Sequence, residues 1–444
     1  MPGSLCGDAA RPARHAPFFR RRMYPSRPPA SKGDHDFPGP CRYNCMQHAL
    51  HGGTMGRATP HPDTLCARAG EQLDRTVGGV TTPIHTASAY MRADVGGTAA
   101  YRYPRYNNIP TQAAPAEKIA ALEGAEAGLV MASGMAAEAM ALLAVLAAGD
   151  HVVFQADLYG GTHHFLSVEL PRLGIGYTLV DHADAASLEA AVQGNTRAVY
   201  VETPSNPLFH VVDLAAVAEV ARRHDLVSIA DNTFASPINQ NPLALGFDLV
   251  VHSGTKYLNG HSDLNCGAVA GSRRLMDKVR ERAVDYGVTL NVYDCFLLER
   301  GMKTLGLRMA RHNENALALA GYLSGHRLVS RVYYPGLPDH PGHDIAARQM
   351  RGFGGMLSFE LDCSQKRARQ AVAGLELILE AVSLGGVESL ICFPCETSHA
   401  KMPPDERRRQ GISDTLVRLS AGIEDAADLM ADLERALALA MRDG

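Results

Sequence analysis

Strand-like and helix-like segments alternate between residues 111 and 253, and this alternation limits the possible folds more than any other feature of the chain. Short apolar runs, which we take as strands, occupy residues 128–132, 151–155, 177–180, 198–202, 226–230 and 248–252. Strands that alternate with helices of this length usually pair in parallel, and the helices cover both faces of the resulting sheet. The sequence therefore predicts an α/β domain with a mostly parallel sheet.

The pattern of elements changes after about residue 306. The expected elements there are a long helix, two strands and a final helix, at about residues 292–324, 332–334, 356–361 and 426–441. This mixture is typical of an α+β domain. We therefore predict a large domain at residues 111–306 and a C-terminal domain at residues 307–444.

The N-terminal part of the chain has a different composition. Residues 1–58 are rich in proline, arginine and glycine, contain few acidic residues and show no apolar periodicity. We expect a disordered leader or a mis-called start, with translation beginning at a site such as Met55; an organellar transit peptide is the alternative. Residues 59–110 contain many turn formers. We expect them to form an arm that reaches a neighbouring subunit.

Composition argues against several classes of protein. A formal net charge of -4 argues against a nucleic-acid-binding protein, which would need a basic patch or stripe. No apolar run approaches the roughly 20 residues that span a bilayer. The nine cysteines are an odd number scattered over a long chain, unlike a secreted disulfide framework. We take the Cys392-x-x-Cys395 spacing as structural or incidental and expect no metal site. A reducing compartment, the cytoplasm, is the simplest location.

Two predicted strands end at residues that suit one particular cofactor. Lys256 follows the hydroxyl residues Ser253 and Thr255 after one strand, and Asp231 ends the strand before it. Pyridoxal phosphate needs a lysine for a Schiff base and an acid that keeps its pyridine nitrogen protonated. Serine and threonine hydroxyls can donate to its phosphate. The alternative is a surface lysine after an ordinary strand.

Other candidate residues also follow predicted strands, and parallel sheets bind ligands at the carboxyl ends of their strands. The backbone amides of Gly134 and Met135 open a helix and are typical of a phosphate cradle, although a plain turn would look the same. Tyr159 precedes two glycines and has a ring that can lie on a planar cofactor or simply pack. Asn206 follows the fourth strand.

Three further candidate binding sites lie outside the ends of these predicted strands. Tyr103 and Arg105 form either a phosphate clamp or an ordinary loop pair. Arg418 lies in an apolar strand, where an arginine makes a structural ion pair or clamps a substrate carboxylate. Ser383 begins a glycine-rich loop.

Together, these motifs resemble the Cys/Met-metabolism enzymes that use pyridoxal phosphate, the transsulfuration family. The resemblance runs from about residue 62 to the C-terminus. It implies an aspartate-aminotransferase-like fold (fold type I) and a homotetramer built from catalytic dimers that share active sites. It also implies a role in methionine or cysteine metabolism, with a small sulfur amino acid as substrate.

The resemblance also implies a role for each matching residue. Lys256 corresponds to the Schiff-base lysine, and Asp231 to the partner of the pyridine nitrogen. The implied phosphate ligands are Gly134, Met135, Ser253 and Thr255, joined across the subunit interface by Tyr103 and Arg105. Tyr159 corresponds to the ring-stacking residue, and both tyrosines are candidate catalytic groups. Arg418, Asn206 and Ser383 correspond to the site for the substrate carboxylate. The arm departs from the family pattern at Ile109, which precedes Pro110.

The C-terminal half is most similar to that of the lyases that cleave L-cystathionine to homocysteine, pyruvate and ammonia. Val382 stands where enzymes that handle cystathionine by γ-chemistry often carry a glutamate, and Gly161 where methionine γ-lyases tend to carry a cysteine. The resemblance therefore favours a carbon–sulfur β-lyase. A γ-lyase, or a γ-replacement enzyme such as cystathionine γ-synthase or O-acylhomoserine sulfhydrylase, is the alternative. A nicotinamide dehydrogenase is disfavoured, because no Gly-x-Gly-x-x-Gly follows a strand.

Overall fold

The computed structural model describes residues 60–74, 76–91, 102–181, 184–400 and 402–441. The predicted leader, residues 1–58, lies outside the described residues, as does part of the predicted arm. All described residues belong to one compact unit. No helix in this described part of the chain is long and apolar enough to cross a membrane.

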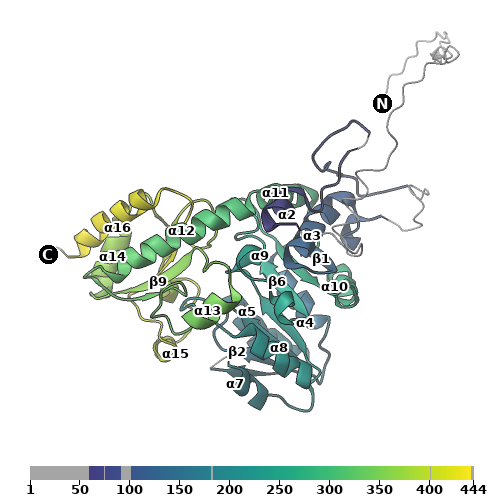
Figure 1. Cartoon of the computed structure of the whole chain (residues 1–444). Coiled ribbons are helices and arrows are strands. Elements are labelled where there is room, and N and C mark those ends of the chain that lie inside the picture. Colours follow the sequence, from purple (N-terminus) through teal and green to yellow (C-terminus); the bar gives the residue numbers. More distant parts are fainter. Residues whose placement is uncertain (1–59, 75, 92–101, 182–183, 401, 442–444) are drawn as a thin grey trace, which may run out of the picture. The chain divides into compact units, whose positions relative to one another are not determined.

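A seven-stranded sheet forms the first half of the fold (Figure 1). Its strands, in spatial order, are β1 (Ala127–Met131), β7 (Gly267–Gly271), β6 (Leu249–Ser253), β5 (Val227–Asp231), β4 (Thr196–Glu202), β2 (His151–Gln155) and β3 (Gly176–Val180). Neighbours from β6 to β3 pair in parallel, whereas β7 is antiparallel to both β6 and β1. The prediction of a mostly parallel sheet is confirmed.

The sequence pattern missed β7, the one reversed strand. Its sequence, Gly-Ala-Val-Ala-Gly, carries almost no β-branched or aromatic side chains, so its intrinsic preference for a strand is low. Small residues are needed here because a Cβ atom on Gly267 would lie 2.0 Å from the Ser133 carbonyl oxygen. Close backbone approach, rather than strand propensity, explains the composition of β7.

Helices cover both faces of this sheet. On one face, apolar side chains of the strands pack with Met140 of α4 (Gly134–Leu143) and Val279 of α10 (Arg273–Tyr286). On the other face, α8 (Leu214–Arg223) contributes Val217 to a second buried cluster. Side-chain caps fix where these helices begin: Ser133, Asp213 and Ser272 each accept a hydrogen bond from a backbone amide of the first turn.

The remaining elements that precede the second sheet are short, apart from three long helices. They are α2 (Pro62–Arg68), η1 (Pro104–Tyr106), α3 (Pro110–Glu123), α5 (Gly160–His164), η2 (Phe165–Glu169), α6 (Leu170–Arg172), α7 (Ala185–Ala190), α9 (Ser236–Asn239), η3 (Pro242–Leu245), α11 (Val292–Met302) and α12 (Leu305–Ser324). The single helix predicted at about residues 292–324 is therefore two helices, α11 and α12, which meet near Lys303. The prediction was wrong because both segments carry helical periodicity, and the two residues between them, Lys303 and Thr304, are neither proline nor glycine.

A five-stranded sheet forms the second half. Its strands, in spatial order, are β10 (Leu379–Glu380), β11 (Leu390–Cys392), β12 (Leu416–Ser420), β9 (Met356–Leu361) and β8 (Val329–Tyr333). The other elements here are α13 (His343–Gln349), α14 (Gln365–Ala373), η4 (Pro394–Glu396), α15 (Pro404–Arg409) and α16 (Ala426–Ala440). Helices α12, α14 and α16 gather around β9 and bury a separate core (Figure 1). The domain boundary at residue 306 stays a prediction.

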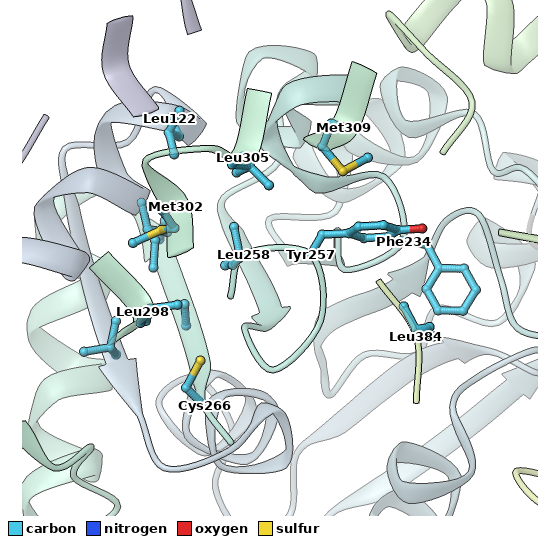
Figure 2. Packing of buried hydrophobic residues seen from close by; sticks show 14 of the residues in the cluster. Leu122, Phe234, Tyr257, Leu258, Cys266, Leu298, Met302, Leu305, Met309 and Leu384 are labelled. Carbon is cyan, nitrogen blue, oxygen red and sulfur yellow. The ribbon is translucent and has the colours of Figure 1, made fainter. Parts of the chain in front are cut away.

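A fourth buried cluster joins the two halves and contains Tyr257, the neighbour of Lys256. Figure 2 shows Tyr257 and Leu258 packed among residues of α11 and α12, with Phe234 and Leu384 beyond the tyrosine ring. The backbone N–H of Gly355 donates to the Tyr257 hydroxyl at 3.1 Å. The backbone that carries Lys256 is thus fixed by a fully buried aromatic side chain.

Candidate active site

A cavity of about 560 Å³ lies where the carboxyl ends of the parallel strands meet loops of the second sheet. All the predicted site residues except Tyr103 and Arg105 line it. These are Gly134, Met135, Tyr159, Asn206, Asp231, Ser253, Thr255, Lys256, Ser383 and Arg418. Ser133, the N-cap residue of α4, also lines the cavity. Residues far apart in the sequence therefore converge as the rule for parallel sheets predicts.

Lys256 follows β6 in a tight turn and reaches the second half of the fold. Its Nζ atom donates to the Ser383 hydroxyl at 2.8 Å. Burial, together with the positive charge of Arg418, lowers the pKa of Lys256 to about 8. Such an amine is partly neutral near physiological pH and can act as a nucleophile or base.

Asp231 ends β5 at the base of the cavity and is 5% exposed. Its Oδ1 atom accepts a hydrogen bond from the Thr233 amide at 2.8 Å. Burial raises the pKa of this carboxyl, while the Thr233 hydrogen bonds and the charge of His252 lower it. A cationic ring nitrogen would compensate the cost of ionising Asp231 here.

The start of α4 forms an anion cradle against β6. A Cβ atom on Gly134 would lie 2.8 Å from the Cβ atom of Ser253, so only glycine brings the helix start this close. The Ser133 hydroxyl caps the helix by accepting from the Ala136 amide at 3.1 Å, which leaves the Gly134 and Met135 amides facing the cavity end of the helix. A helix start with free amides suits a phosphate group.

The hydroxyl groups of Ser253 and Thr255, beside Lys256, differ in the hydrogen bonds that they make within the chain. The Ser253 hydroxyl makes no hydrogen bond to the part of the chain that the structure describes, and Ser253 lines the cavity. The Thr255 hydroxyl already donates to the Cys266 carbonyl at 3.2 Å and accepts from the Cys266 amide at 2.9 Å. Ser253 is thus the freer of the two donors for a phosphate.

Tyr159 directly precedes α5 as its N-cap residue and is 47% exposed, with its ring against the first turn of the helix. A Cβ atom on Gly161 would lie 2.5 Å from the Tyr159 Cε1 atom and 2.8 Å from the Met135 sulfur. The ring therefore occupies the space that any side chain at position 161 would need. This arrangement presents the ring to the cavity and suits stacking on a planar group.

Arg418 lies on β12 and is buried, yet no carboxylate pairs with it among the described residues. Its Nη1 atom donates to the Asn206 side-chain oxygen at 3.0 Å, and Nη2 donates to the Ser383 carbonyl at 3.2 Å. The Nε atom is buried without a partner in the described chain. A buried guanidinium with an unused donor suits a carboxylate from outside the chain.

Tyr103 and Arg105 lie away from this cavity. Tyr103 is 42% exposed, and the Arg105 guanidinium stacks on both Tyr103 and Tyr106. The Arg105 Nη1 atom donates to the Val284 carbonyl on α10 at 2.9 Å. The structure therefore does not bring these two residues to the site within the chain, and their predicted contact with a neighbouring subunit stays a prediction.

The structure adds residues that sequence reasoning missed. Glu138, Glu202, Thr233, Asn265, Thr397 and Ser398 also line the cavity. Glu202 ends β4, so the rule that found Asp231 would have found it too. Glu138 lies one turn inside α4, where only tertiary packing decides which side chains reach the cavity.

The residues in the cavity fit pyridoxal phosphate. Asp231 offers a carboxylate for a ring nitrogen, Lys256 an amine for an aldehyde, and the start of α4 with Ser253 a set of donors for a phosphate. The unpartnered Arg418 Nε atom leaves a separate place for an amino-acid carboxylate.

Comparison with known proteins gives the same result. The model of the Cys/Met metabolism PLP-dependent enzyme family matches residues 63–438. A cystathionine beta-lyase from Coxiella burnetii is 46% identical over 380 residues, which cover 85% of this chain and 98% of that protein. A cystathionine gamma-lyase from Bacillus subtilis is 43% identical over 375 residues, covering 84% and 98%.

A solved structure is similar over the same region. The crystal structure of a cystathionine gamma synthase from Xanthomonas oryzae pv. oryzae, in complex with aminoacrylate and cysteine, superimposes with a TM-score of 0.83. It shares 42% sequence identity, and the match covers 86% of this chain and 99% of that one. The chain therefore belongs to the Cys/Met-metabolism family of pyridoxal-phosphate-dependent enzymes, and it is a transsulfuration enzyme with the type I fold of that family.

Proposed function

We propose that this enzyme is a cystathionine β-lyase, which cleaves L-cystathionine to homocysteine, pyruvate and ammonia. The observation that carries the proposal is Val382, which lines the cavity beside Ser383 and is 64% exposed. An apolar side chain at this place cannot make the charged contact to a distal ammonium that a glutamate would make, and the γ-synthases and γ-lyases that handle cystathionine often carry a glutamate there. The valine fits β-lyases, and it also fits methionine γ-lyases and sulfhydrylases. The name of the Coxiella burnetii relative supports the same activity.

The cofactor would be held by the groups that fit it. Asp231 holds the ring nitrogen, Tyr159 stacks on the ring, and the Gly134 and Met135 amides with Ser253 and Thr255 hold the phosphate. When bound, pyridoxal phosphate supplies an electron sink for negative charge at the substrate Cα atom.

The chain supplies the proton transfers. Arg418, with Asn206 and the Ser383 carbonyl beside it, holds the substrate carboxylate and so fixes the Cα–H bond relative to Lys256. The Lys256 amine, whose pKa is lowered to about 8, removes the Cα proton. Lys256 or a tyrosine such as Tyr159 or the partner subunit's Tyr103 then gives a proton to the departing sulfur.

The finer properties predicted for the family form part of this proposal. We propose a cytoplasmic homotetramer built from catalytic dimers, in which the arm at residues 59–110 carries Tyr103 and Arg105 to a neighbouring active site. The exposure of Tyr103 and the position of Arg105 outside the cavity of its own chain support this arrangement.

The alternative functions use the same residues. Relatives named cystathionine gamma-lyase and cystathionine gamma-synthase match this chain at 43% and 44% identity, nearly as well as the β-lyase. γ-Chemistry requires a second proton removal, at Cβ, and Lys256 can serve both steps. An O-acylhomoserine sulfhydrylase would need the same groups with an acylated homoserine.

Incubation of the purified holoenzyme with L-cystathionine, followed by identification of the keto acid, tests the proposal. Pyruvate with homocysteine is expected. 2-Oxobutyrate with cysteine would identify a γ-lyase and overturn the interpretation of Val382. If neither product forms, an ester-dependent reaction of O-acylhomoserine with cysteine or sulfide would identify a γ-replacement enzyme.

A further inference from the structure

Three buried carboxyl groups lie together at the base of the cavity. Glu202 on β4 and Asp231 on β5 are register partners, so they project from the same face of the sheet on strands about 4.8 Å apart. Glu138 reaches the same cavity from α4. The exposed fractions of Glu138, Glu202 and Asp231 are only 4%, 4% and 5%.

The hydrogen bonds to Glu138 and Glu202 come from uncharged donors. The Tyr159 backbone amide donates to the Glu202 Oε2 atom at 2.8 Å. The Thr162 hydroxyl lies 2.6 Å from the Glu138 Oε2 atom. Tyr159 and Thr162 stand on either side of the two glycines that begin α5. Two acids thus hold both ends of the segment at residues 159–162, which we call the Tyr159 segment.

We propose that Glu138 and Glu202 are positioning residues, which act as neutral carboxylic acids to hold the Tyr159 segment over the cofactor. Asp231 is then the one ionised acid of the three. A single carboxylate matches the single positive charge of a protonated ring nitrogen, whereas three adjacent buried carboxylates would leave two charges uncompensated. A neutral acid still accepts a hydrogen bond through its carbonyl oxygen.

The electrostatic surroundings support this assignment. Burial and the neighbouring Asp231 raise the pKa of Glu138 to about 8, and the same two causes raise that of Glu202 well above its ordinary value. The neighbouring acids Asp231, Glu138 and Asp157 each raise the pKa of Glu202. Beside the cluster, burial and the charges of the three acids raise the pKa of the Tyr200 hydroxyl well above its ordinary value.

Glutamine and alanine substitutions test this proposal separately from the identity of the substrate. Glu138→Gln and Glu202→Gln keep a carbonyl acceptor of the same shape without a charge, while Glu138→Ala and Glu202→Ala remove it. The readouts are the dissociation constant for pyridoxal phosphate, measured at pH 7 with cofactor-free protein, and the visible circular dichroism of the bound cofactor. Glu219→Gln, on the exposed face of α8, is the matched control.

We expect both glutamine variants to bind the cofactor within about threefold of the wild type and to keep its dichroism. The alanine variants should bind it at least about tenfold more weakly, because the Tyr159 segment loses an anchor. Glutamine variants that bind the cofactor at least about tenfold more weakly than the wild type would show that the charge is needed and overturn the proposal. If the alanine variants do not fold, the glutamine variants alone decide it. Folded alanine variants with wild-type affinity would also overturn it.

Discussion

The Nζ atom of Lys256 donates a hydrogen bond to the Oγ atom of Ser383, at a distance of 2.8 Å. Ser383 adopts a φ of 85°, a left-handed conformation that is strained for a residue with a side chain. The Arg418 guanidinium donates to the carbonyl of the same residue. One strained residue therefore contacts both the proposed base and the proposed carboxylate clamp.

Replacing Lys256 with alanine should lower kcat by about a thousandfold or more, because the chain loses both its cofactor attachment and its base. Steady-state assays with L-cystathionine measure this loss, and the visible absorbance of the purified protein reports the attachment. Lys278→Ala, at an exposed position of α10, is the control. Substantial lyase activity in Lys256→Ala would contradict the assignment.

Cofactor capture should depend on pH through Lys256. The folded protein lowers the pKa of this amine to about 8, so the neutral, reactive form is the minor form at pH 7 and the major form at pH 9. The rate at which cofactor-free protein incorporates pyridoxal phosphate should rise over this interval, with a midpoint near 8. Stopped-flow absorbance measures it. A rate that does not change between pH 7 and pH 9 would rule out this role of the lowered pKa.

Gly161→Ala should displace the Tyr159 ring, because the added methyl group would lie 2.5 Å from its Cε1 atom. We expect the dissociation constant for pyridoxal phosphate to rise about tenfold, the effect of losing roughly 1.4 kcal/mol of stacking and packing. Gly194→Ala is a matched control, since a Cβ atom there meets nothing within 4 Å. Equal affinities in the two variants would show that the ring does not support the cofactor.

Arg418→Lys should weaken substrate binding without weakening cofactor binding. Lysine keeps the positive charge but cannot reproduce the forked contact with a carboxylate or the bonds to Asn206 and Ser383. We expect KM for L-cystathionine to rise by about tenfold or more. Arg222→Lys, in an exposed ion pair on α8, serves as the control. An unchanged KM would indicate that Arg418 is only structural.

The central part of the site could be predicted because it depends on local signals. Lys256 and Asp231 each come at the end of a buried apolar run, and the rule for parallel sheets places such ends together. Gly134 and Met135 follow a capping serine at a helix start, which is also a local pattern.

The rest of the site depends on tertiary contacts that no local pattern contains. Glu138 reaches the cavity because α4 packs against β6. Thr397 and Ser398 reach it because the segment after η4 lies against the start of α5, where a Cβ atom on Gly160 would lie 2.6 Å from the Ser398 carbonyl oxygen. The sequence around Glu138 is a plain alanine-rich helix, and a carboxylate there would ordinarily be taken as solvent-exposed. Strand β7 was missed for a related reason, since its glycines are set by close contact with Ser133 rather than by strand propensity.

The cavity wall is divided along the chain. Every cavity residue that we propose to hold the cofactor lies between positions 134 and 256. Of the residues proposed for the substrate carboxylate, Ser383 lies in the loop between β10 and β11, Arg418 lies on β12, and Asn206 alone comes from the first half of the fold. The residues proposed for the reaction and most of those proposed for substrate binding thus come from separate parts of the sequence. Such a chain can acquire a new substrate through changes in its last third while its reactive centre stays intact, and directed evolution toward other sulfur amino acids should begin there.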